Sequence, residues 1–234
     1  MERAGKALVV LSGGLDSTTC MALAAIEHEV EAVSFYYGQK HKNELAHAEM
    51  VAAYYNARWS LIELPKVFAG TDSTLVEDNQ IDNPRGSYKD VQDIEGEQVS
   101  PTYVPYRNGS LLSLATAHAL VVGADTLYAG MHAEDAAHWA YPDCTPEFLG
   151  AMANAIYIGS YRKVRLATPL QWLSKGEVVR LGTEIGAPFH LTMSCYDGKS
   201  PACGTCPTCI GRINAFRENA LVDPIEYEID IDWS

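Results

Sequence analysis

Residues 7–19 read Ala7-Leu8-Val9-Val10-Leu11-Ser12-Gly13-Gly14-Leu15-Asp16-Ser17-Thr18-Thr19. This stretch decides the fold, because an apolar run typical of a buried strand breaks at two glycines and continues as a segment that can form a helix. The glycines permit a tight turn and let backbone N–H groups approach an anion, at a helix N-terminus that favours negative charge. The stretch therefore predicts a phosphate-binding loop, with a nucleotide as the expected ligand.

The loop differs from the two commonest nucleotide signatures. No lysine follows the glycines, so the G-x-x-x-x-G-K-[ST] motif is absent, and there is no G-x-G-x-x-G motif for a dinucleotide. A simple glycine turn at a strand end is the alternative, but it does not explain the hydroxyl and carboxylate side chains around the glycines. The run S-G-G-x-D-S instead resembles the signature of the PP-loop ATP pyrophosphatases, which cleave ATP between its α- and β-phosphates.

Composition narrows the class of protein. The chain has 234 residues, 47% hydrophobic and 20% charged, which suits one sizeable globular core. The formal net charge of −13 opposes binding to a nucleic-acid backbone, so a small substrate is expected and no direct nucleic-acid partner. No apolar run is long enough to cross a bilayer, and residues 1–6 lack a secretory leader. We expect a cytoplasmic protein without a membrane partner, its cysteines reduced or metal-bound.

Apolar and helix-compatible segments alternate along the chain. Strands are expected at 7–11, 30–36, 59–64, 126–131 and 164–167, and helices at 17–28, 41–56, 108–122 and 146–158. A further helix is expected to begin after Ser174, because Ser174 and Glu177 form a capping-box pattern, and to stop at Gly186. The alternation predicts an α/β fold with a doubly wound parallel sheet and a ligand crevice at the carboxyl ends of the strands.

Two segments depart from this alternation. Residues 65–104 are rich in Gly, Pro, Asp and Asn, and a connection of that length often forms a lid. Residues 225–233 alternate apolar and acidic side chains with period two, which favours an edge strand or a subunit contact. We expect an ATP-binding α/β domain over 1–190, followed by a small metal-binding segment with a strand-like tail over 191–234.

Four cysteines form the second strong signal. Cys195, Cys203, Cys206 and Cys209 have the spacing C-x7-C-x2-C-x2-C, and thiolates so spaced can converge on one tetrahedral ion, so structural zinc is the expected ligand. An iron–sulfur cluster is the alternative, although the fourth Cys-Pro of a ferredoxin run is missing. The other two cysteines, Cys20 and Cys144, are expected to be small packed residues.

Together with the phosphate-binding loop and the four cysteines, further motifs narrow the resemblance from the PP-loop enzymes in general to one family. The chain resembles the 7-cyano-7-deazaguanine synthases, a PP-loop family with the adenine nucleotide alpha hydrolase-like fold, from about residue 7 to residue 217. The motifs that carry the resemblance, besides the loop and the cysteines, are F-Y-Y-G-Q-K-H at 35–41, V-P-Y-R-N at 104–108, Y-P-D-C at 141–144, T-P-L-Q-W at 168–172, K-G-E at 175–177 and S-C-Y-D-G at 194–198.

The resemblance implies an ATP-dependent ligase of queuosine-type deazapurine biosynthesis. Its partners would be ATP, ammonia and 7-carboxy-7-deazaguanine, and its product would be 7-cyano-7-deazaguanine (preQ0), formed through an adenylated carboxylate and an amide. It also implies Mg²⁺ with ATP, one structural Zn²⁺ per chain and a homodimer. A related PP-loop enzyme that stops at the amide, or a tRNA thiolase-like enzyme, is the alternative; a noncatalytic zinc-bearing nucleic-acid module is the weakest one.

The resemblance also assigns site residues. Asp16, Lys175 and Arg107 are expected in catalysis: Asp16 supports the loop or the metal, Lys175 faces the α-phosphate, and Arg107 offers a fork to a carboxylate or the nucleotide. Arg107, Asn108 and Asp143 are expected to bind the substrate, with Asp143 reading the guanine-like edge. The ATP-binding residues are expected to be Leu11, Ser12, Gly13, Gly14, Leu15, Asp16, Ser17, Thr18, Thr19, Cys20 and Met21.

Plainer roles are open for each of these residues: a carboxylate at a helix start for Asp16, an exposed lysine in a first helical turn for Lys175, a helix N-cap at Asn108, and an ordinary turn at Asp143. Three departures from the family pattern matter as well. Tyr106 stands where the family has glycine, Thr145 stands where an arginine often follows the cysteine, and the run M-H-A-E-D at 131–135 replaces the commoner run before Y-P-D-C. These changes keep open a reaction that stops at the amide, or a different carboxylated deazapurine as substrate.

Overall fold

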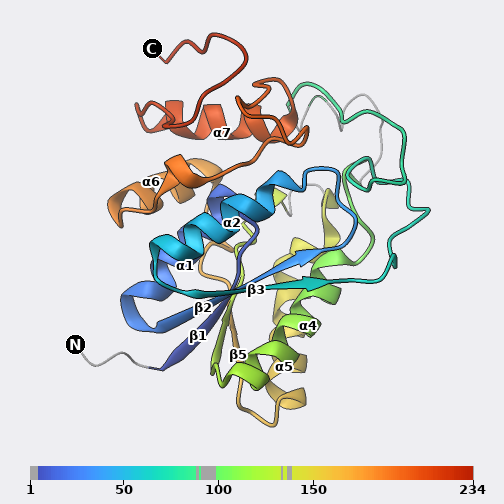
Figure 1. Cartoon of the computed structure of the whole chain (residues 1–234), viewed down its shortest axis with the longest axis vertical. Coiled ribbons are helices and arrows are strands. Elements are labelled where there is room, and N and C mark those ends of the chain that lie inside the picture. Colours follow the sequence, from blue (N-terminus) through green and yellow to red (C-terminus); the bar gives the residue numbers. More distant parts are fainter. Residues whose placement is uncertain (1–4, 88–89, 91–98, 133, 136–138, 234) are drawn as a thin grey trace.

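Five parallel strands form the centre of the molecule (Figure 1). The structure is a computed structural model that describes residues 5–87, 90, 99–132, 134–135 and 139–233. The strands lie in the order β3-β2-β1-β4-β5. All neighbouring pairs are parallel, and Val9 at the centre pairs with Ala32 of β2 and Tyr128 of β4. Their bounds are β1 (Lys6–Val10), β2 (Glu29–Tyr36), β3 (Arg58–Glu63), β4 (Thr126–Tyr128) and β5 (Arg165–Ala167).

Helices cover both faces of this sheet, which confirms the doubly wound fold (Figure 1). On one face, apolar side chains of α1, α2 and α6 pack against alternate residues of β1 such as Val9. On the other face, α4 and α5 pack against Leu8 and against Val33 of β2. The helix bounds are α1 (Leu15–Glu27), α2 (Asn43–Tyr54), α4 (Arg107–Val122), α5 (Pro146–Gly159) and α6 (Lys175–Glu184).

The strand order places a crevice beside the end of β1. The chain winds from β1 towards β3 in one direction and continues from β4 to β5 in the other, so β1 and β4 flank the switch point where ligands bind in such sheets. Gly13 makes the turn that follows β1 with φ +84°. A Cβ at this position would lie 2.3 Å from the carbonyl oxygen of Glu44 in α2, so only glycine fits between the loop and that helix.

Helix α6 begins and ends as its sequence predicts. The Ser174 side chain accepts a hydrogen bond from the Glu177 N–H, and the Glu177 carboxylate accepts one from the Ser174 N–H. These reciprocal bonds satisfy two donors that the first helical turn leaves free. Gly186 follows the helix with φ +72°, which ends it in the left-handed conformation.

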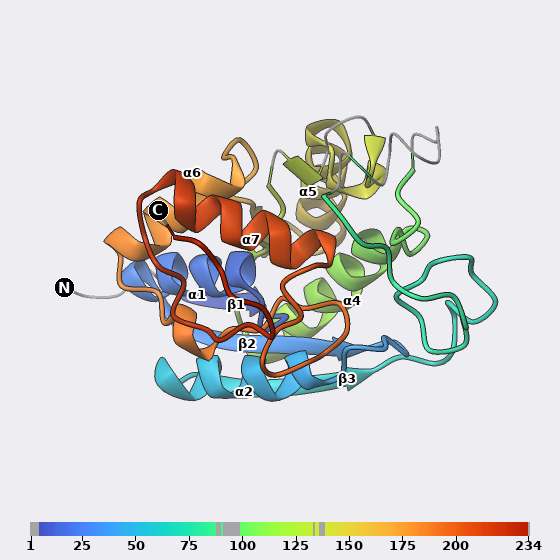
Figure 2. The ribbon, with the colours of Figure 1, turned by 90° about the horizontal axis from the view of Figure 1, so that it is seen from above.

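The C-terminal segment contains one helix that the sequence analysis missed. Helix α7 (Pro207–Glu218) begins between the third and fourth cysteines of the motif, with proline at its first position, and lies beside α6 (Figure 2). The edge strand expected over 225–233 is wrong. In the described residues this tail makes an isolated bridge between Ala202 and Tyr227, because Ile225 and Tyr227 pack on the cysteine cluster and not on a sheet edge.

The long connection of residues 65–104 reaches the crevice through Leu75. Of its described residues, 65–87 and 99–104 contain no named helix or strand. They are nevertheless partly buried, since Phe68, Leu75, Val76 and Val104 form a small apolar cluster with Tyr37, which follows β2. This cluster anchors the connection beside the crevice. Among the helices of the described residues, none has the length and apolar character to cross a membrane.

Candidate functional site

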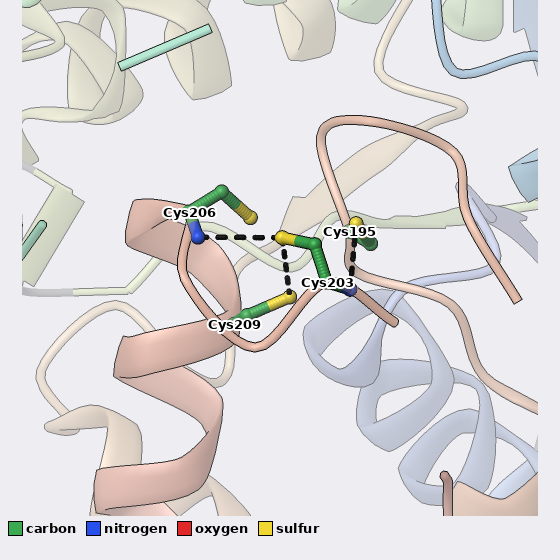
Figure 3. A group of neighbouring side chains, drawn as sticks. All are labelled: Cys195, Cys203, Cys206 and Cys209. Carbon is green, nitrogen blue, oxygen red and sulfur yellow. Dashed lines mark hydrogen bonds between the residues drawn. The ribbon is translucent and has the colours of Figure 1, made fainter. Parts of the chain in front are cut away.

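The four cysteines of the C-terminal motif converge (Figure 3). Cys195, Cys203, Cys206 and Cys209 are all buried, and their sulfur atoms lie within 4.8 Å of one another. The sulfur of Cys203 also accepts backbone N–H bonds from Thr205 at 3.5 Å and Cys206 at 3.4 Å, which stabilise a thiolate. Four converging buried sulfurs with such support fit a tetrahedral metal ion. The motif therefore forms a candidate metal centre, as its spacing predicts.

A cavity of about 1120 Å³ lies beside this centre, at the carboxyl end of β1. Its walls come from segments far apart in the sequence: the loop after β1, the end of β2, the starts of α4, α6 and α7, residues 129–132, 134–135 and 139–141, and residues 193, 194 and 196. Most of the motifs that carry the family resemblance contribute to these walls. The cavity is therefore the candidate active site.

The loop after β1 presents its hydroxyls to the cavity as a connected set. The hydroxyls of Ser12 and Ser17 lie 3.0 Å apart, the Gly14 N–H donates to Ser12 Oγ at 3.3 Å, and Ser17 Oγ donates to the Gly14 carbonyl at 3.2 Å. These bonds fix the turn in a compact shape at the N-terminus of α1. Backbone N–H groups at a helix start, with hydroxyls beside them, suit a phosphate group.

The residues expected to bind ATP separate into two groups. Those that line the cavity are Leu11, Ser12, Gly14, Leu15, Asp16 and Ser17. Those that lie outside its lining are Gly13, Thr18, Thr19, Cys20 and Met21. In the second group, Thr18, Thr19, Cys20 and Met21 are inaccessible to solvent. The structure therefore brings the first group together at the cavity, whereas ATP contacts of the second group stay a prediction.

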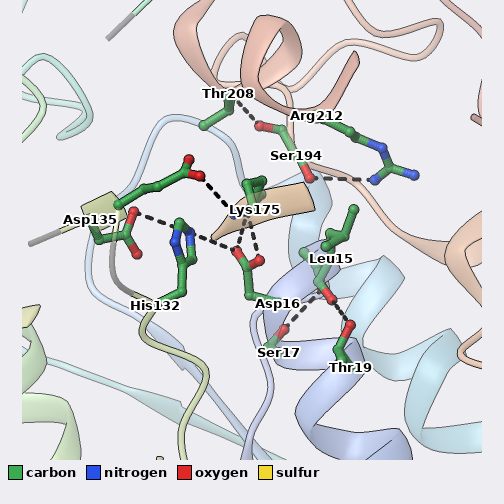
Figure 4. A network of polar contacts seen from close by, with 12 residues as sticks. Leu15, Asp16, Ser17, Thr19, His132, Asp135, Lys175, Ser194, Thr208 and Arg212 are labelled. Carbon is green, nitrogen blue, oxygen red and sulfur yellow. Dashed lines mark hydrogen bonds and ion pairs between the residues drawn. The ribbon is translucent and has the colours of Figure 1, made fainter. Parts of the chain in front are cut away.

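Asp16 and Lys175, which both line the cavity, are in direct contact with one another (Figure 4). The Lys175 ammonium lies 2.7 Å and 2.5 Å from the two Asp16 oxygens, and Nε2 of buried His132 lies 3.9 Å from Asp16. Glu134 accepts a hydrogen bond from the Lys175 N–H at 2.8 Å, which fixes the start of α6. Burial raises the pKa of Asp16, but the charges of Lys175 and His132 outweigh it and leave this pKa below its ordinary value.

Arg107, at the start of α4, forms a second positive group at the cavity. Its Nη1 donates to the Tyr37 hydroxyl at 3.2 Å, and Nε and Nη2 donate to Asn108 Oδ1 at 3.4 and 3.3 Å. Burial lowers the pKa of Arg107, but the interactions with Tyr37 and Asp143 more than offset this and leave the pKa raised. A half-buried guanidinium whose hydrogen bonds go to neutral groups can still pair with a carboxylate or phosphate.

Asp143 lies one layer behind the cavity wall. It is 3% exposed, and its Oδ2 accepts a hydrogen bond from the Asn108 N–H at 2.8 Å, which fixes the first turn of α4. Asn108 and Cys144 line the cavity, whereas Asp143 does not. The Asn108 amide also contacts the Cys144 sulfur at 3.1 Å. The structure therefore brings Arg107 and Asn108 to the cavity and gives Asp143 a supporting contact behind them.

Two of the departures from the family pattern, Tyr106 and Thr145, lie outside the cavity lining, whereas Met131, His132, Glu134 and Asp135 of the third departure line the cavity. Tyr106 has φ +54°, the left-handed conformation that glycine adopts most easily, and its side chain is 56% exposed and packs edge-on against Phe148. Thr145 caps α5 by accepting a hydrogen bond from the Phe148 N–H. Neither side chain reaches the cavity.

Several cavity residues were not assigned from the sequence. Ser194 and Tyr196 belong to the S-C-Y-D-G motif, and Tyr37 to the F-Y-Y-G-Q motif, so these motifs held the signal. Thr208, between two cysteines, and His132 also line the cavity. His132 and His138 lie near acidic residues in the sequence, but so scattered a set predicts no metal site; His138 lies outside the described residues.

Comparison with known proteins agrees with these motifs. The model of the family "Queuosine biosynthesis protein QueC" matches residues 6–220. The 7-cyano-7-deazaguanine synthase of Caldicellulosiruptor bescii is 41% identical over 229 residues, covering 97% of this chain and 100% of that protein. The protein of the same name from Thermoplasma acidophilum is 39% identical over 233 residues, covering 97% of this chain and 94% of its own length.

A solved structure supports the fold. The U34-tRNA thiolase NcsA from Methanococcus maripaludis superimposes with a TM-score of 0.50 at 14% identity, covering 83% of this chain and 62% of that chain. At this identity the likeness concerns the architecture alone. The family model and the relatives of similar length, together with the loop and the cysteine centre, show that the chain belongs to the QueC family of queuosine biosynthesis proteins.

Proposed function

We propose that this chain converts 7-carboxy-7-deazaguanine and ammonia to 7-cyano-7-deazaguanine at the expense of ATP. The relatives bear the name of this synthase, and one observation carries the proposal to this chain. The S-G-G-x-D-S loop, the Lys175–Asp16 pair and the Arg107 guanidinium all face a single cavity. A nucleotide phosphate and a carboxylate could therefore meet there within reach of two cations.

The loop after β1 is proposed to hold the phosphates of ATP. Ser12, Gly14 and Ser17 supply hydroxyls and a backbone N–H at the N-terminus of α1. Mg²⁺ is proposed to accompany ATP with Asp16 as its carboxylate ligand, because an ionised carboxylate in the cavity fits this hard cation, which would supply charge neutralisation on the phosphates.

The other part of the cavity is proposed to hold the deazapurine. Phe35, Tyr37, Tyr141 and Tyr196 supply aromatic side chains to its lining, which suit a flat heterocycle. Arg107 would pair with the substrate carboxylate through a planar fork. Asp143 is proposed to support binding of the guanine-like edge through the Asn108 N–H that it holds.

The chemistry follows from these positions. A carboxylate oxygen of the substrate attacks the α-phosphorus of ATP, and pyrophosphate leaves with its electron pair, which gives an acyl adenylate. Ammonia then adds to the acyl carbon, a proton is lost, and AMP leaves to give the amide. The amide oxygen attacks a second ATP in the same way. Loss of AMP and of the remaining N–H protons then gives the nitrile. The Lys175 ammonium would stabilise the charge that develops on the α-phosphate.

One observation favours the nitrile over a reaction that stops at the amide: Tyr106 and Thr145 both lie outside the cavity lining. The third departure, over residues 131–135, contributes Met131, His132, Glu134 and Asp135 to the lining, so the product of the reaction with ammonium decides between nitrile and amide. A tRNA thiolase-like reaction is disfavoured as well. It would need a reactive cysteine pair, but Cys20 is buried in the core, and burial raises the pKa of the Cys144 thiol well above its ordinary value.

The proposed metal ion, localisation and oligomeric state rest on the cysteine centre and on the family resemblance. Zinc is the proposed ion, since four thiolates without an open position are typical of structural zinc sites. Reduced metal-binding cysteines fit a cytoplasmic enzyme. The net charge of −13 disfavours a direct nucleic-acid partner, and the resemblance implies a homodimer, which light scattering would test.

The deciding experiment incubates the metal-loaded protein with ATP, Mg²⁺, ammonium and 7-carboxy-7-deazaguanine. Mass spectrometry then follows both the adenine nucleotide and the base. Nitrile together with AMP is the expected result. Accumulation of the amide would instead assign the truncated reaction, and the absence of substrate-dependent AMP would overturn the proposal. A reaction without ammonium serves as the control, because it should stop at the adenylate.

A further inference from the structure

Arg212 of α7 is a buried arginine that the proposed reaction does not yet use. It is 1% exposed, and its guanidinium contacts residues 189–194 and, in the C-terminal tail, Asp223. Its Nη1 donates to Thr192 Oγ1 at 2.6 Å and to Ser194 Oγ at 3.4 Å, and its Nη2 donates to the carbonyl oxygen of Phe189 at 3.2 Å. These three contacts all go to the segment that runs from the end of α6 to the first cysteine of the metal centre.

The C-terminal tail fixes this arginine in place. Asp223 accepts two bonds from Arg212, at 2.6 Å from Nε and 2.8 Å from Nη2, in the bidentate arrangement that gives the strongest geometric constraint. The Tyr227 hydroxyl donates to the same carboxylate at 2.7 Å. Both charged side chains are essentially inaccessible to water, at 1% and 0% exposure. An ion pair so buried and so fully hydrogen-bonded defines one geometry for the guanidinium.

This geometry determines how the hydroxyl of Ser194 can act. A guanidinium donates hydrogen bonds and accepts none, so the Ser194 oxygen is the acceptor in its contact with Arg212. The hydroxyl hydrogen of Ser194 is then free to point elsewhere, and Ser194 lines the cavity. Figure 4 shows Ser194 between Arg212 and Thr208, whose hydroxyl donates to the Ser194 carbonyl oxygen at 2.6 Å. Ser194 is therefore held as a hydrogen-bond donor towards the ligand.

The position of this donor indicates which ligand group it meets. The Met193 N–H donates to the carbonyl oxygen of Gly13 at 2.9 Å, so the residue before Ser194 is bonded directly to the turn of the phosphate loop. Cys195, the next residue, belongs to the metal centre. Ser194 thus lies between the two, beside the glycines at which a pyrophosphate group is expected.

We propose that Ser194 donates a hydrogen bond to the pyrophosphate portion of ATP, and that Arg212 is the residue that positions it. The inference rests on the proposed function, because it takes the cavity to be the ATP site. It adds to that function a phosphate contact supplied by the C-terminal segment. The cysteine centre and the Arg212–Asp223 pair then act together to hold this contact against the loop.

The first test measures the binding of inorganic pyrophosphate with Mg²⁺ to the metal-loaded protein by calorimetry. Ser194→Ala should raise the Kd for pyrophosphate about tenfold, the usual effect of losing one hydrogen bond to a charged group. The Kd for AMP should be unchanged, and Ser194→Thr, which retains a hydroxyl, should restore much of the affinity. Ser110→Ala is the matched control, because that hydroxyl bonds the Tyr106 carbonyl oxygen outside the cavity.

The second test asks whether Arg212 acts through Ser194. Arg212→Lys should weaken pyrophosphate binding, since an ammonium cannot reproduce the planar fork, and adding Ser194→Ala should cause little further loss. The paired change Arg212→Met with Asp223→Leu removes both charges at once and should give the same non-additivity. Metal content, measured by mass spectrometry, should stay at one ion per chain in Arg212→Lys. If the paired variant does not fold, Arg212→Lys decides the point.

The outcomes separate the two proposals. If the wild-type protein bound neither pyrophosphate nor ATP, the proposed function itself would fail. If the wild type bound pyrophosphate and Ser194→Ala bound it equally well, only the assignment of Ser194 would be overturned. Fully additive losses in the combined variant would reject the positioning role of Arg212, while leaving the serine contact in place.

Discussion

The ammonium group of Lys175 contacts both carboxylate oxygens of Asp16, at 2.7 Å and 2.5 Å, although the two residues are 159 positions apart in the sequence. Asp16 belongs to the first turn of α1, directly after the phosphate loop, and Lys175 is the first residue of α6. The pair therefore ties two helix starts together at the cavity. It also keeps a cation in the cavity at the place where the nucleotide phosphates are proposed to bind.

Replacing Lys175 should impair adenylation more than binding. We expect Lys175→Met to lower the rate of AMP formation roughly a hundredfold or more, the usual effect of removing a group that stabilises charge in a transition state. Lys175→Arg should retain part of the rate. Rapid-quench measurement of AMP under single-turnover conditions checks this. Arg180→Gln is the control, since Arg180 lies on the same helix with its side chain 61% exposed. An unchanged rate in Lys175→Met would remove this residue from the chemistry.

Metal removal should release the C-terminal segment from the rest of the protein. The four cysteines are buried, and the segment before them bonds the phosphate loop through Met193 and Gly13. We expect chelation, or Cys203→Ser, to lower the melting temperature by several degrees, because metal binding in such sites is coupled to folding. Elemental analysis should find one zinc per chain. Iron with labile sulfide and visible absorbance would instead favour the cluster alternative, and a chain without metal at full stability would contradict the centre.

Cys144 should behave as an inert thiol despite its place in the cavity wall. Burial raises its pKa well above the ordinary value of 9.0, and the negative charges of Asp135 and Asp143 add to this. The thiol form then persists at pH 8, so alkylation by iodoacetamide should be slow in the native protein. Cys144→Ser should keep activity within a few-fold. Rapid modification at pH 8, read by mass spectrometry, would revive the thiolase-like alternative.

Much of the fold could be predicted from the sequence because its signals are local. Residues 7–11 form a continuous apolar run, the other strand segments are rich in apolar and β-branched residues, and Ser174 with Glu177 marks a helix start by side chains three residues apart. The tail of residues 225–233 shows where this reasoning fails. Its apolar and acidic residues do alternate, but Ile225 and Tyr227 pack on the cysteine cluster. This contact depends on tertiary packing, which the local sequence pattern does not determine.

The candidate site shows the same difference between local sequence signals and contacts made by the fold. The loop residues and the four cysteines lie close in sequence, so their grouping could be predicted from spacing. The contact between Lys175 and Asp16, and that between Asp143 and the Asn108 N–H, join residues brought together only by the fold. Burial also limits what a segment can contribute: Thr18 and Thr19 directly follow the loop signature, but both are inaccessible to solvent.

Substitutions at Tyr106 and Thr145, two of the positions that depart from the family pattern, should affect stability and leave the product unchanged. Tyr106 holds a left-handed conformation, so Tyr106→Gly should relieve backbone strain while losing the ring contact with Phe148. Thr145→Ala should cost about 1 kcal/mol of unfolding free energy, because Thr145 caps α5. Urea unfolding measures both effects. The ratio of nitrile to amide should match the wild type in each variant; a shift towards amide would show that these positions act on the second step.

Two substitutions of Asp143 distinguish a role in substrate recognition from a role at the start of α4. Asp143→Asn keeps an oxygen that can accept the Asn108 N–H bond, whereas Asp143→Ala leaves that donor unpaired at the start of α4. We expect Asp143→Ala to lose about 1–2 kcal/mol of stability and Asp143→Asn to lose less. If the carboxylate also supports binding of the guanine-like edge, Asp143→Asn should raise the KM for the deazapurine with little change in kcat. An unchanged KM would leave capping as its role.

The pH dependence of stability tests the same carboxylate independently. Burial raises the pKa of Asp143 above its ordinary value of 3.8, although the Asn108 N–H and the charge of Arg107 oppose this. The folded state then binds its proton more tightly than the unfolded state, so the contribution of Asp143 to stability falls as pH rises from 3.8 through the raised pKa. Asp143→Asn has no such proton. The unfolding free energy of the wild type minus that of Asp143→Asn should therefore decrease across this interval and stay constant above it. A flat difference would mean that folding leaves the pKa of Asp143 unchanged, and an increasing difference would mean that the folded protein favours the ionised form; either result would contradict the raised pKa.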